Sequence, residues 1–494
     1  CVVLLYTNTR NYPHKGTVTE RVIEAPKWTF HQRLLSDTPF MSVQITFLGG
    51  AGTVTGSKYL VQHEGKKLLV DCGLFQGYKQ LRLRNWSPMP VAPSDVDAVL
   101  LTHAHLDHSG YVPLLYRQGY RGNIHATPAT CDLCAILLPD SGHIQEEDAA
   151  FLNRHGYTKH EPAMPLYSKH DAFLSLQLLK PERETHTFSP IPGWKATFST
   201  AGHILGAASV LVEVAGRRIL FSGDVGRPDD MIMNPPAPPP EADTVLIEST
   251  YGNREHPHEN IMAELAPALK RVAARGGVAV VPVFAVGRAQ ALLHAIDIMK
   301  ERGDIPHSLP IFLDSPMAVH TTDLFQRHPE AHRLDAHALK GLKHVATMIE
   351  STEQSKALSK RHGPMVILAA SGMATGGRVL HHLARYLPDH RNMVILTGYQ
   401  APGTRGATIA GGGTMLRMHG QDVTIHAEVV QLQSSSAHAD ASQLIAWLNQ
   451  MRSKPDQVYV VHGEPEASDA LRQRIERDLS WRAIVPEHGS TWPT

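Results

Sequence analysis

Short apolar runs, bounded by Gly and Asp, dominate the chain from Met41 to about residue 222. Such runs are typical of strands in a sheet. Residues 96–102 are apolar at nearly every position, which indicates a strand buried on both faces. The strands predicted in this way are 43–48, 57–62, 67–70, 96–102, 194–200, 207–214 and 218–222, and helical spacing occurs at 109–118 and 128–138.

A different rhythm begins after the stretch Pro235–Pro240, which has five prolines in six residues and is predicted to be a surface loop. One more strand is predicted at 244–248, and strands then alternate with helices. This alternation is typical of a parallel sheet with covering helices. The predicted strands are 277–283, 310–313 and 364–369, and the predicted helices are 258–274, 287–302, 317–326 and 376–386.

From Met393 the chain returns to strands, followed by a helix at 439–451 and a strand at 457–461. Residues 1–40 lack a clear period, and we interpret them as an N-terminal extension. The predicted division is therefore an extension at 1–40, a first domain at 41–250, an inserted α/β domain at 251–395, and the second part of the first domain at 396–494.

Composition narrows the class of protein only moderately. With 494 residues the chain is too long for one compact core. The 47 basic residues balance the 47 acidic ones, so a strongly basic nucleic-acid binder is not indicated, although a local basic groove is compatible with this balance. Four cysteines give no disulfide framework, and no apolar run approaches the ~18 residues of a membrane span. We therefore predict a cytoplasmic protein without a membrane partner.

The strongest chemical signal directly follows the buried strand at 96–102 and reads His103-Ala104-His105-Leu106-Asp107-His108. His103 and His105 are two positions apart, so an extended strand end places them on the same side, where one metal ion binds both. Asp107 and His108 then suit a second ion. Neutral imidazole and carboxylate are ligands that Zn²⁺ takes, and mixed sites of this kind also accept Mn²⁺.

Three further polar residues stand at predicted strand ends. His203 and Asp224 each follow a strand and a glycine, where a loop can approach a metal closely, and a carboxylate such as Asp224 can bridge two ions. Asp71 follows the strand at 67–70, and we expect it to orient a ligand histidine instead of binding metal. Two zinc ions ~3.5–4 Å apart would stabilise the attacking and leaving oxygens in phosphoryl transfer.

In order and spacing these residues resemble the metallo-β-lactamase superfamily, and the chain past Asp224 resembles its β-CASP group of RNA-processing nucleases. The resemblance runs from about Met41 to near the C-terminus. It implies a four-layer αββα sandwich with an inserted β-CASP α/β cap. The further motifs that carry it are Glu248–Gly252, Phe284–Arg288, Ser371–Met373, Gly398–Gln400, Ser436–Asp440 and Val461–Gly463.

The resemblance also implies roles for single residues. His103, His105 and His203 would bind the first zinc, Asp107, His108 and His462 the second, and Asp224 would bridge. The residues it marks as catalytic are Asp107, His438 and Glu248. His438 stands where the family has its proposed general acid, and Glu248 would orient it. A histidine with a near-neutral pKa suits that proton transfer.

His462 favours RNA over DNA as the substrate, because RNA-processing members resemble this chain there while DNA-processing members usually have an aliphatic residue. The chain departs from the family at Gln433–Ser435, where a glycine and an aromatic residue are typical, and at Pro402, where an acid is common. No additional RNA-binding domain or long C-terminal extension is recognised, which favours endonucleolytic cleavage over 5′ exonuclease action. Single-stranded RNA is the expected substrate, and a homodimer is possible.

A weaker signal follows the strand at 364–369. Backbone N–H groups at a helix start attract phosphate, and the candidate residues for an RNA phosphate are Ser371, Gly372, Thr375 and Arg378. A plain turn between strand and helix explains the same residues equally well.

Two other functions compete with the ribonuclease. A small-molecule hydrolase of this fold, acting on an ester or thioester, would lack the long insertion and the pair His438 and His462. A non-catalytic subunit related to the RNA 3′-end machinery would have lost ligands, whereas every ligand position here is filled.

Overall fold

The structure is a computed structural model that describes residues 42–156, 160, 162–257, 260–398 and 400–494. The extension predicted at 1–40 lies outside the described residues. Residues 40–494 form one compact unit, in which two domains can be distinguished by their separate sheets.

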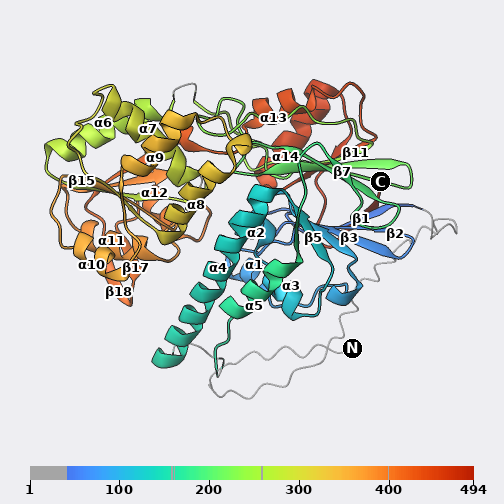
Figure 1. The fold of residues 1–494 in the computed structure, drawn as a ribbon, viewed down its shortest axis with the longest axis horizontal. Coiled ribbons are helices and arrows are strands. Elements are labelled where there is room, and N and C mark those ends of the chain that lie inside the picture. Colours follow the sequence, from blue (N-terminus) through green and yellow to red (C-terminus); the bar gives the residue numbers. More distant parts are fainter. Residues whose placement is uncertain (1–41, 157–159, 161, 258–259, 399) are drawn as a thin grey trace, which may run out of the picture. The chain divides into compact units, whose positions relative to one another are not determined.

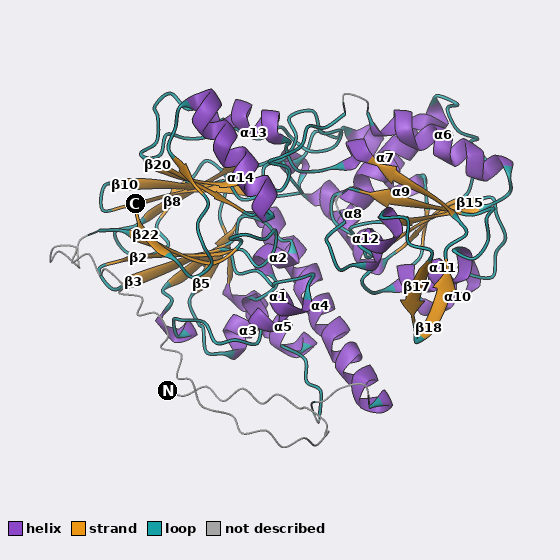
Figure 2. Cartoon of the chain, turned by 180° about the vertical axis from the view of Figure 1, so that it is seen from behind, coloured by secondary structure: helices purple, strands orange, loops and turns teal. Residues whose placement is uncertain are grey.

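Two seven-stranded sheets pack face to face in the first domain (Figures 1 and 2). Phe47 and Val61 of the first sheet share one buried cluster with Phe198 and Phe221 of the second. In spatial order the first sheet is β22 (Thr491–Pro493), β1 (Gln44–Gly49), β2 (Lys58–His63), β3 (Lys66–Val70), β4 (Ala98–Leu100), β5 (Asn123–Ala126) and β6 (Leu179–Pro181). The second is β21 (Ala483–Ile484), β20 (Gln457–Val461), β11 (Thr244–Glu248), β10 (Arg217–Phe221), β9 (Ala208–Val214), β8 (Lys195–Thr200) and β7 (Thr187–Phe188).

Helices cover the outer face of each sheet. On the first sheet Leu115 and Leu138 pack with Val99 in one buried cluster. On the second, Leu444 and Leu471 belong to another cluster. These arrangements confirm the predicted αββα sandwich. The helices of this domain are α1 (Lys79–Arg84), α2 (Leu106–Ser109), α3 (Val112–Arg117), α4 (Pro128–His155), α5 (Lys169–Ser175), α13 (Ala441–Leu448) and α14 (Pro465–Arg474).

The inserted cap contains a six-stranded, all-parallel sheet with helices on both faces, as its alternating pattern predicts. Leu265 and Leu292 belong to a core on one face, and Leu358 and Leu383 to a core on the other. The order is β14 (Thr347–Met348), β13 (Ile311–Asp314), β15 (Met365–Ala369), β12 (Val278–Pro282), β16 (Met393–Thr397) and β19 (Glu428–Leu432). The helices are α6 (Ile261–Ala274), α7 (Arg288–Glu301), α8 (Pro316–Arg327), α9 (Ala336–His344), α10 (Thr352–Leu358), α11 (Arg378–Tyr386) and α12 (Arg405–Ala410).

The cap sheet extends beyond residue 395, which is the predicted end of the cap. Strand β19 pairs in parallel with β16 from Met393↔Glu428 to Thr397↔Leu432. A hairpin of β17 (Met415–Met418) and β18 (Gln421–Thr424) precedes it. The chain therefore leaves the cap after Leu432. The pattern of short strands did not reveal this, because strand periodicity does not identify the sheet that a strand joins.

Helix α4 is longer than predicted, since the apolar spacing at 128–138 fades while the helix continues to His155. Thr127 caps its start by accepting a hydrogen bond from the Thr130 N–H, and Pro128 occupies the first turn, where a missing N–H costs nothing. The second half of the helix carries polar and acidic residues. Within the described part of the chain, no helix combines the length and apolar character needed to cross a membrane.

Candidate metal centre

The candidate ligands lie on loops that follow the carboxyl ends of strands in both sheets. In α/β folds this is the edge where ligands bind, because neighbouring parallel strands end there together. His103, His105, Asp107 and His108 follow β4 of the first sheet. From the second sheet come His203 after β8, Asp224 after β10 and His462 after β20. The structure brings all seven predicted ligands together.

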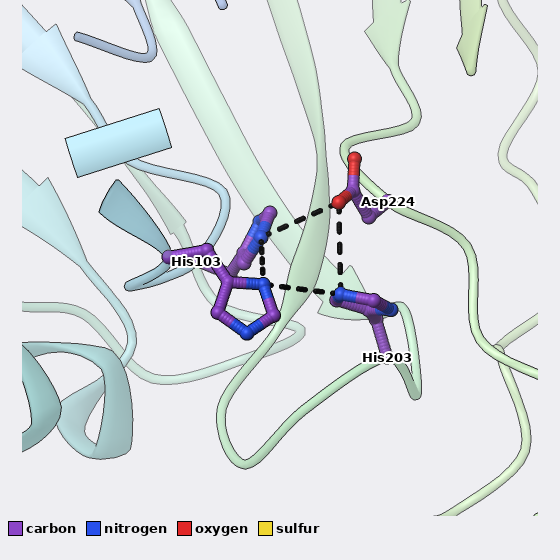
Figure 3. Close-up of side chains that lie close together, drawn as sticks. His103, His203 and Asp224 are labelled. Atoms are coloured by element: carbon purple, nitrogen blue, oxygen red, sulfur yellow. Dashed lines mark hydrogen bonds and ion pairs between the residues drawn. The ribbon is translucent and has the colours of Figure 1, made fainter. Parts of the chain in front are cut away.

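One group of ligand atoms comes from His103, His105, His203 and Asp224 (Figure 3). His105 Nδ1 lies 3.1 Å from His103 Nε2 and 3.2 Å from His203 Nε2. Asp224 Oδ2 lies 3.5 Å from His103 Nε2 and 3.6 Å from His203 Nε2. Ligands held by one tetrahedral zinc at about 2.0–2.1 Å would lie about 3.3–3.4 Å apart. These residues therefore fit a zinc ion, which would satisfy three imidazole nitrogens that otherwise face one another.

A second group comes from Asp107, His108 and His462. His462 Nε2 lies 3.0 Å from His108 Nε2 and 3.5 Å from Asp107 Oδ2. The other oxygen of Asp224, Oδ1, lies 3.2 Å from His108 Nε2. One carboxylate therefore faces both groups, Oδ2 towards the first and Oδ1 towards the second. This is the position required of a residue that bridges two ions.

Asp71 contacts a ligand histidine instead of the ligand groups themselves. Its Oδ2 lies 2.8 Å from His108 Nδ1, and its Oδ1 accepts a hydrogen bond of 2.8 Å from the Thr102 N–H. A carboxylate on the far nitrogen fixes the ring and leaves Nε2 as the metal-facing atom. Asp71 and His462 both adopt left-handed backbone, with φ of +59° and +50°. Non-glycine residues tolerate this conformation mainly where the surrounding structure imposes it, as at functional sites.

Burial affects the protonation of the first ligand group. His103 and His203 are almost completely buried, and this desolvation holds the pKa of each well below its usual value. Burial also lowers the pKa of His105 to about 4. These three imidazoles are therefore neutral at physiological pH, which is the form that binds a metal ion.

Glu248 and His438 form a pair beside the ligands. His438 Nδ1 lies 3.1 Å and 3.2 Å from the two Glu248 oxygens. The buried carboxylate also accepts hydrogen bonds from the N–H groups of Val225 (2.7 Å) and Thr250 (3.2 Å). Burial opposes a charged imidazole, but Glu248 raises the pKa of His438 above its usual value. The histidine ring lies 4.3 Å from the ring of His203.

Local backbone structure positions His438. The backbone of His438 forms an antiparallel β-bridge with Gly226, and the Ala439 N–H donates to the Val225 carbonyl over 2.7 Å. Asp440 then caps α13 in a reciprocal capping box with Gln443. The unusual Gln433–Ser435 stretch has therefore not displaced the histidine from Glu248.

Two glycines allow the ligand loops to approach each other. A Cβ on Gly73 would lie 1.6 Å from the Asp107 carbonyl oxygen, and one on Gly226 would lie 2.0 Å from the Gly202 carbonyl oxygen. Neither contact is sterically possible, so any side chain at these positions would push a ligand loop away.

The predicted phosphate loop lies on the wall of the same cleft, but its donors have internal partners. Ser371 Oγ accepts hydrogen bonds from the N–H groups of Thr375 (3.0 Å) and Gly376 (3.4 Å). Arg378 donates to Asp314 Oδ1 over 2.7 Å, and to two backbone carbonyls. These contacts favour the plain-turn interpretation, and Arg378 has a structural partner that the sequence did not reveal.

Sequence reasoning also missed three polar residues of these sites. Thr102 holds Asp71, Thr250 Oγ1 lies 3.1 Å from His462 Nδ1, and Asp314 ends a buried strand of the cap. Asp314 carried the same signal as Asp71 and Asp224, a carboxylate at a strand end, and could have been found by it.

Comparisons with known proteins identify the family. Three family models match: "Metallo-beta-lactamase superfamily" at 51–126, "Beta-Casp domain" at 289–409 and "Zn-dependent metallo-hydrolase RNA specificity domain" at 422–486. A relative named "Ribonuclease TTHA0252", from Thermus thermophilus, is 38% identical over 87% of this chain and 95% of its own.

The chain belongs to the β-CASP group of the metallo-β-lactamase superfamily. The predicted family, fold class and hydrolase class are thereby confirmed. A further relative is named "Transcription termination factor FttA", from Methanosarcina mazei, and is 31% identical over 88% of this chain and 69% of its own. "RNase J-like protein" from Methanocaldococcus jannaschii is 29% identical over 91% of this chain and 100% of its own.

Proposed function

We propose that this β-CASP protein is a zinc-dependent ribonuclease that hydrolyses phosphodiester bonds of single-stranded RNA with two metal ions. The observation that carries the proposal is the pair of ligand groups that share Asp224. Relatives named as a ribonuclease and as an RNase J-like protein support RNA as the substrate. The matched RNA specificity model, which contains His438 and His462, supports it further.

In this proposal His103, His105 and His203 would hold one ion, Asp107, His108 and His462 would hold the other, and Asp224 would contribute one oxygen to each group. The ions are Zn²⁺, and Mn²⁺ is an alternative that the same ligands accept. When bound, two such ions supply Lewis-acid stabilisation of the charge that develops on the phosphate. Asp71 keeps the ring of His108 oriented.

His438 acts as the general acid that protonates the leaving oxygen. Its Nδ1 is held by Glu248, which leaves Nε2 as the atom that delivers the proton. The raised pKa of His438 maintains the protonated form near neutral pH, as a proton donor requires. Both His438 and Asp107 line the cleft and so can reach a bound substrate.

The size of the cleft favours a polymer over a small ester. It encloses about 2440 Å³, and its lining extends from the α1 region and α4 to the β17–β18 hairpin of the cap. Pockets for small molecules are typically about 300–1,000 Å³. We propose endonucleolytic cleavage, because a cleft of this extent has room for RNA that continues past the metals. A cytoplasmic location and a homodimer stay predictions.

The first experiment compares cleavage of an internally labelled single-stranded RNA with cleavage of a DNA of the same sequence. The control is the His103→Ala/His105→Ala variant. Cleavage of RNA alone, lost in the variant, is the expected result. A covalently closed circular RNA tests the endonuclease, because an exonuclease has no end at which to begin. Hydrolysis of small esters without cleavage of RNA would contradict the proposal and favour the alternative hydrolase.

A further inference from the structure

The two walls of the cleft differ in chemistry. On the cap side, the described lining residues include six lysines and arginines of α10, α11, α12 and β17 or next to them, and one carboxylate, Asp314, which is paired with Arg378. On the opposite side, α4 contributes the acids Asp140, Glu147 and Asp148 together with Arg154, and α1 contributes Arg82, so this wall is of mixed charge. These six cations, called the cap cations below, are Lys356, Lys360, Arg378, Arg385, Arg405 and Arg417; Arg288, at the start of α7, also lines the cleft.

Among the described residues, four of the six cap cations have no ion-pair partner. One of the four, Arg405, is half-buried and donates hydrogen bonds to the backbone carbonyls of Arg417 and Thr375. Lys356 and Lys360 lie on and just after α10, Arg385 lies near the end of α11, and all three are exposed. By contrast, Arg378 is bound to Asp314 and Arg417 to Asp422. One exposed carboxylate, Glu353, lies near Lys356. The exposed cations still outnumber it, and a polyanion relieves the repulsion among them.

The opposite wall combines its acids with exposed apolar side chains. Trp86 is 58% exposed, Ile144 41%, Phe151 42% and Met164 57%, and all four line the cleft. Trp86 is well positioned, because the neighbouring Asn85 is buried and exchanges two hydrogen bonds, of 2.9 Å and 2.8 Å, with the Phe75 backbone. With three acids against two arginines, this wall attracts phosphates much less than the cap wall does, while aromatic rings attract bases by stacking.

We propose that single-stranded RNA lies in the cleft with its phosphates along the cap wall, on Lys356, Lys360 and Arg385, and its bases against Trp86 and α4. The inference rests on the proposed ribonuclease function and adds the orientation of the strand. In Figures 1 and 2, α4 lies on one side of this region and α10, α11 and the β17–β18 hairpin on the other. Recognition of this kind is largely independent of base sequence.

Two variants test the two walls of the cleft separately. The first is Lys356→Gln/Lys360→Gln/Arg385→Gln, with the control Lys270→Gln/Arg302→Gln/Lys340→Gln, which changes exposed cations of the cap that do not line the cleft. The second is Trp86→Ala, with the control Phe173→Ala, an aromatic residue that is 65% exposed outside the cleft. Each is measured as the full zinc-loaded chain in a His438→Ala background that preserves the ligand.

The probes are a single-stranded RNA of about 12 nucleotides, within the usual range of such sites, and an abasic oligonucleotide of equal length. For the triple variant we expect weaker binding of both probes. The slope of log affinity against log salt should fall by about 2, since each lost phosphate contact contributes about 0.7. For Trp86→Ala we expect RNA affinity to fall about 5- to 150-fold, with the abasic probe unaffected. Neither control variant should change binding.

Equal effects of the triple variant and its control would overturn the phosphate assignment. If Trp86→Ala lowers the affinity for both probes equally, or lowers neither, the assignment of the bases to this wall is overturned. Hydrolysis of bis(p-nitrophenyl) phosphate, by variants that retain His438, should stay unchanged, because this small diester reaches only the metals. If the unmodified enzyme fails to cleave any RNA, the proposed function fails. If it cleaves RNA while all variants bind normally, only the orientation fails.

Discussion

Each domain has a buried aspartate–histidine cluster at the carboxyl ends of its strands, and the two clusters differ in how they are satisfied. In the cap, Asp314 Oδ1 accepts from Arg378 over 2.7 Å, and Oδ2 lies 2.6 Å from both His382 Nε2 and Ser355 Oγ. Every partner of this carboxylate is a donor. The carboxylate is therefore satisfied by its neighbours, although His382 Nδ1 has no hydrogen-bond partner in the described part of the chain, and the cluster is best described as a structural ion-pair network.

In the first domain the ratio of hydrogen-bond donors to acceptors is reversed. Imidazole nitrogens face one another at 3.0–3.2 Å, and Asp224 lies among them. Neutral imidazoles cannot satisfy several mutual contacts of this kind by hydrogen bonding, because each ring carries only one N–H. A cation resolves the arrangement. The ratio of hydrogen-bond donors to acceptors, and not the residue types alone, therefore distinguishes a metal site from a structural network.

The largest effect should follow from removing ligands of the first group. In His103→Ala/His105→Ala we expect RNA cleavage to fall on the order of 10³-fold or more, since several kcal/mol of charge stabilisation are lost with the metal. Metal content per chain, measured by elemental analysis, should fall in parallel. Circular dichroism checks that the fold is retained. Normal cleavage with no bound metal would contradict the assignment of the site.

Substitution in the cap cluster should lower the stability of the fold and leave the metal content unchanged. In Asp314→Ala the free energy of unfolding should decrease by about 3–5 kcal/mol, because half-buried Arg378 and fully buried His382 lose their carboxylate. Denaturant titration measures this change, and zinc content should stay at the unmodified level. The control is Asp323→Ala, which breaks the more exposed pair with Lys343 and should cost less than about 1 kcal/mol. A loss of zinc in Asp314→Ala would contradict the assignment of the cap cluster as a purely structural network.

Replacing Asp71 should have a smaller effect on the metal centre. In Asp71→Asn we expect metal affinity to weaken about 10- to 100-fold, because the amide supports the His108 ring less strongly than the carboxylate does. Competition with a chelator measures the affinity. Asp95→Asn, at a side chain that is 55% exposed, is the matched control. Unchanged affinity in Asp71→Asn would mean that the ring is held by other contacts.

The smallest effect is the pH dependence of the cap cluster. Burial opposes the charge of Asp314, but His382, Ser355 and Arg378 lower the pKa of its carboxyl below the usual value. A depressed pKa stabilises the fold at pH values above the pKa of the unfolded chain, and this contribution disappears as pH falls through the folded value. The stability difference between unmodified protein and Asp314→Asn should therefore shrink below about pH 4. A difference that persists or grows in acid would contradict this assignment.

The short strands β5, β6, β7, β21 and β22 were not predicted. The sequence by itself predicted the longer strands of the sandwich, the alternating elements of the cap and a set of candidate ligands. These follow from local signals, because apolar periodicity and polar residues after buried strands are visible in short windows of sequence. The strands predicted at 244–248 and 457–461 coincide with β11 and β20. The candidate ligands lie where strand ends meet. For His103, His203 and Asp224 the pattern of polar residues after strands predicted this position, whereas for His462 only the family resemblance implied it.

Only the tertiary structure decided which sheet each late strand joins, and it decided the partners of single side chains. Strand β19 pairs within the cap, and Arg378 is bound to Asp314 at a separation of 64 residues in the chain. The opposed walls of the cleft likewise bring Trp86 and Lys356 into one cavity. Contacts of this kind depend on packing between distant segments, for which a single sequence carries no periodic signal.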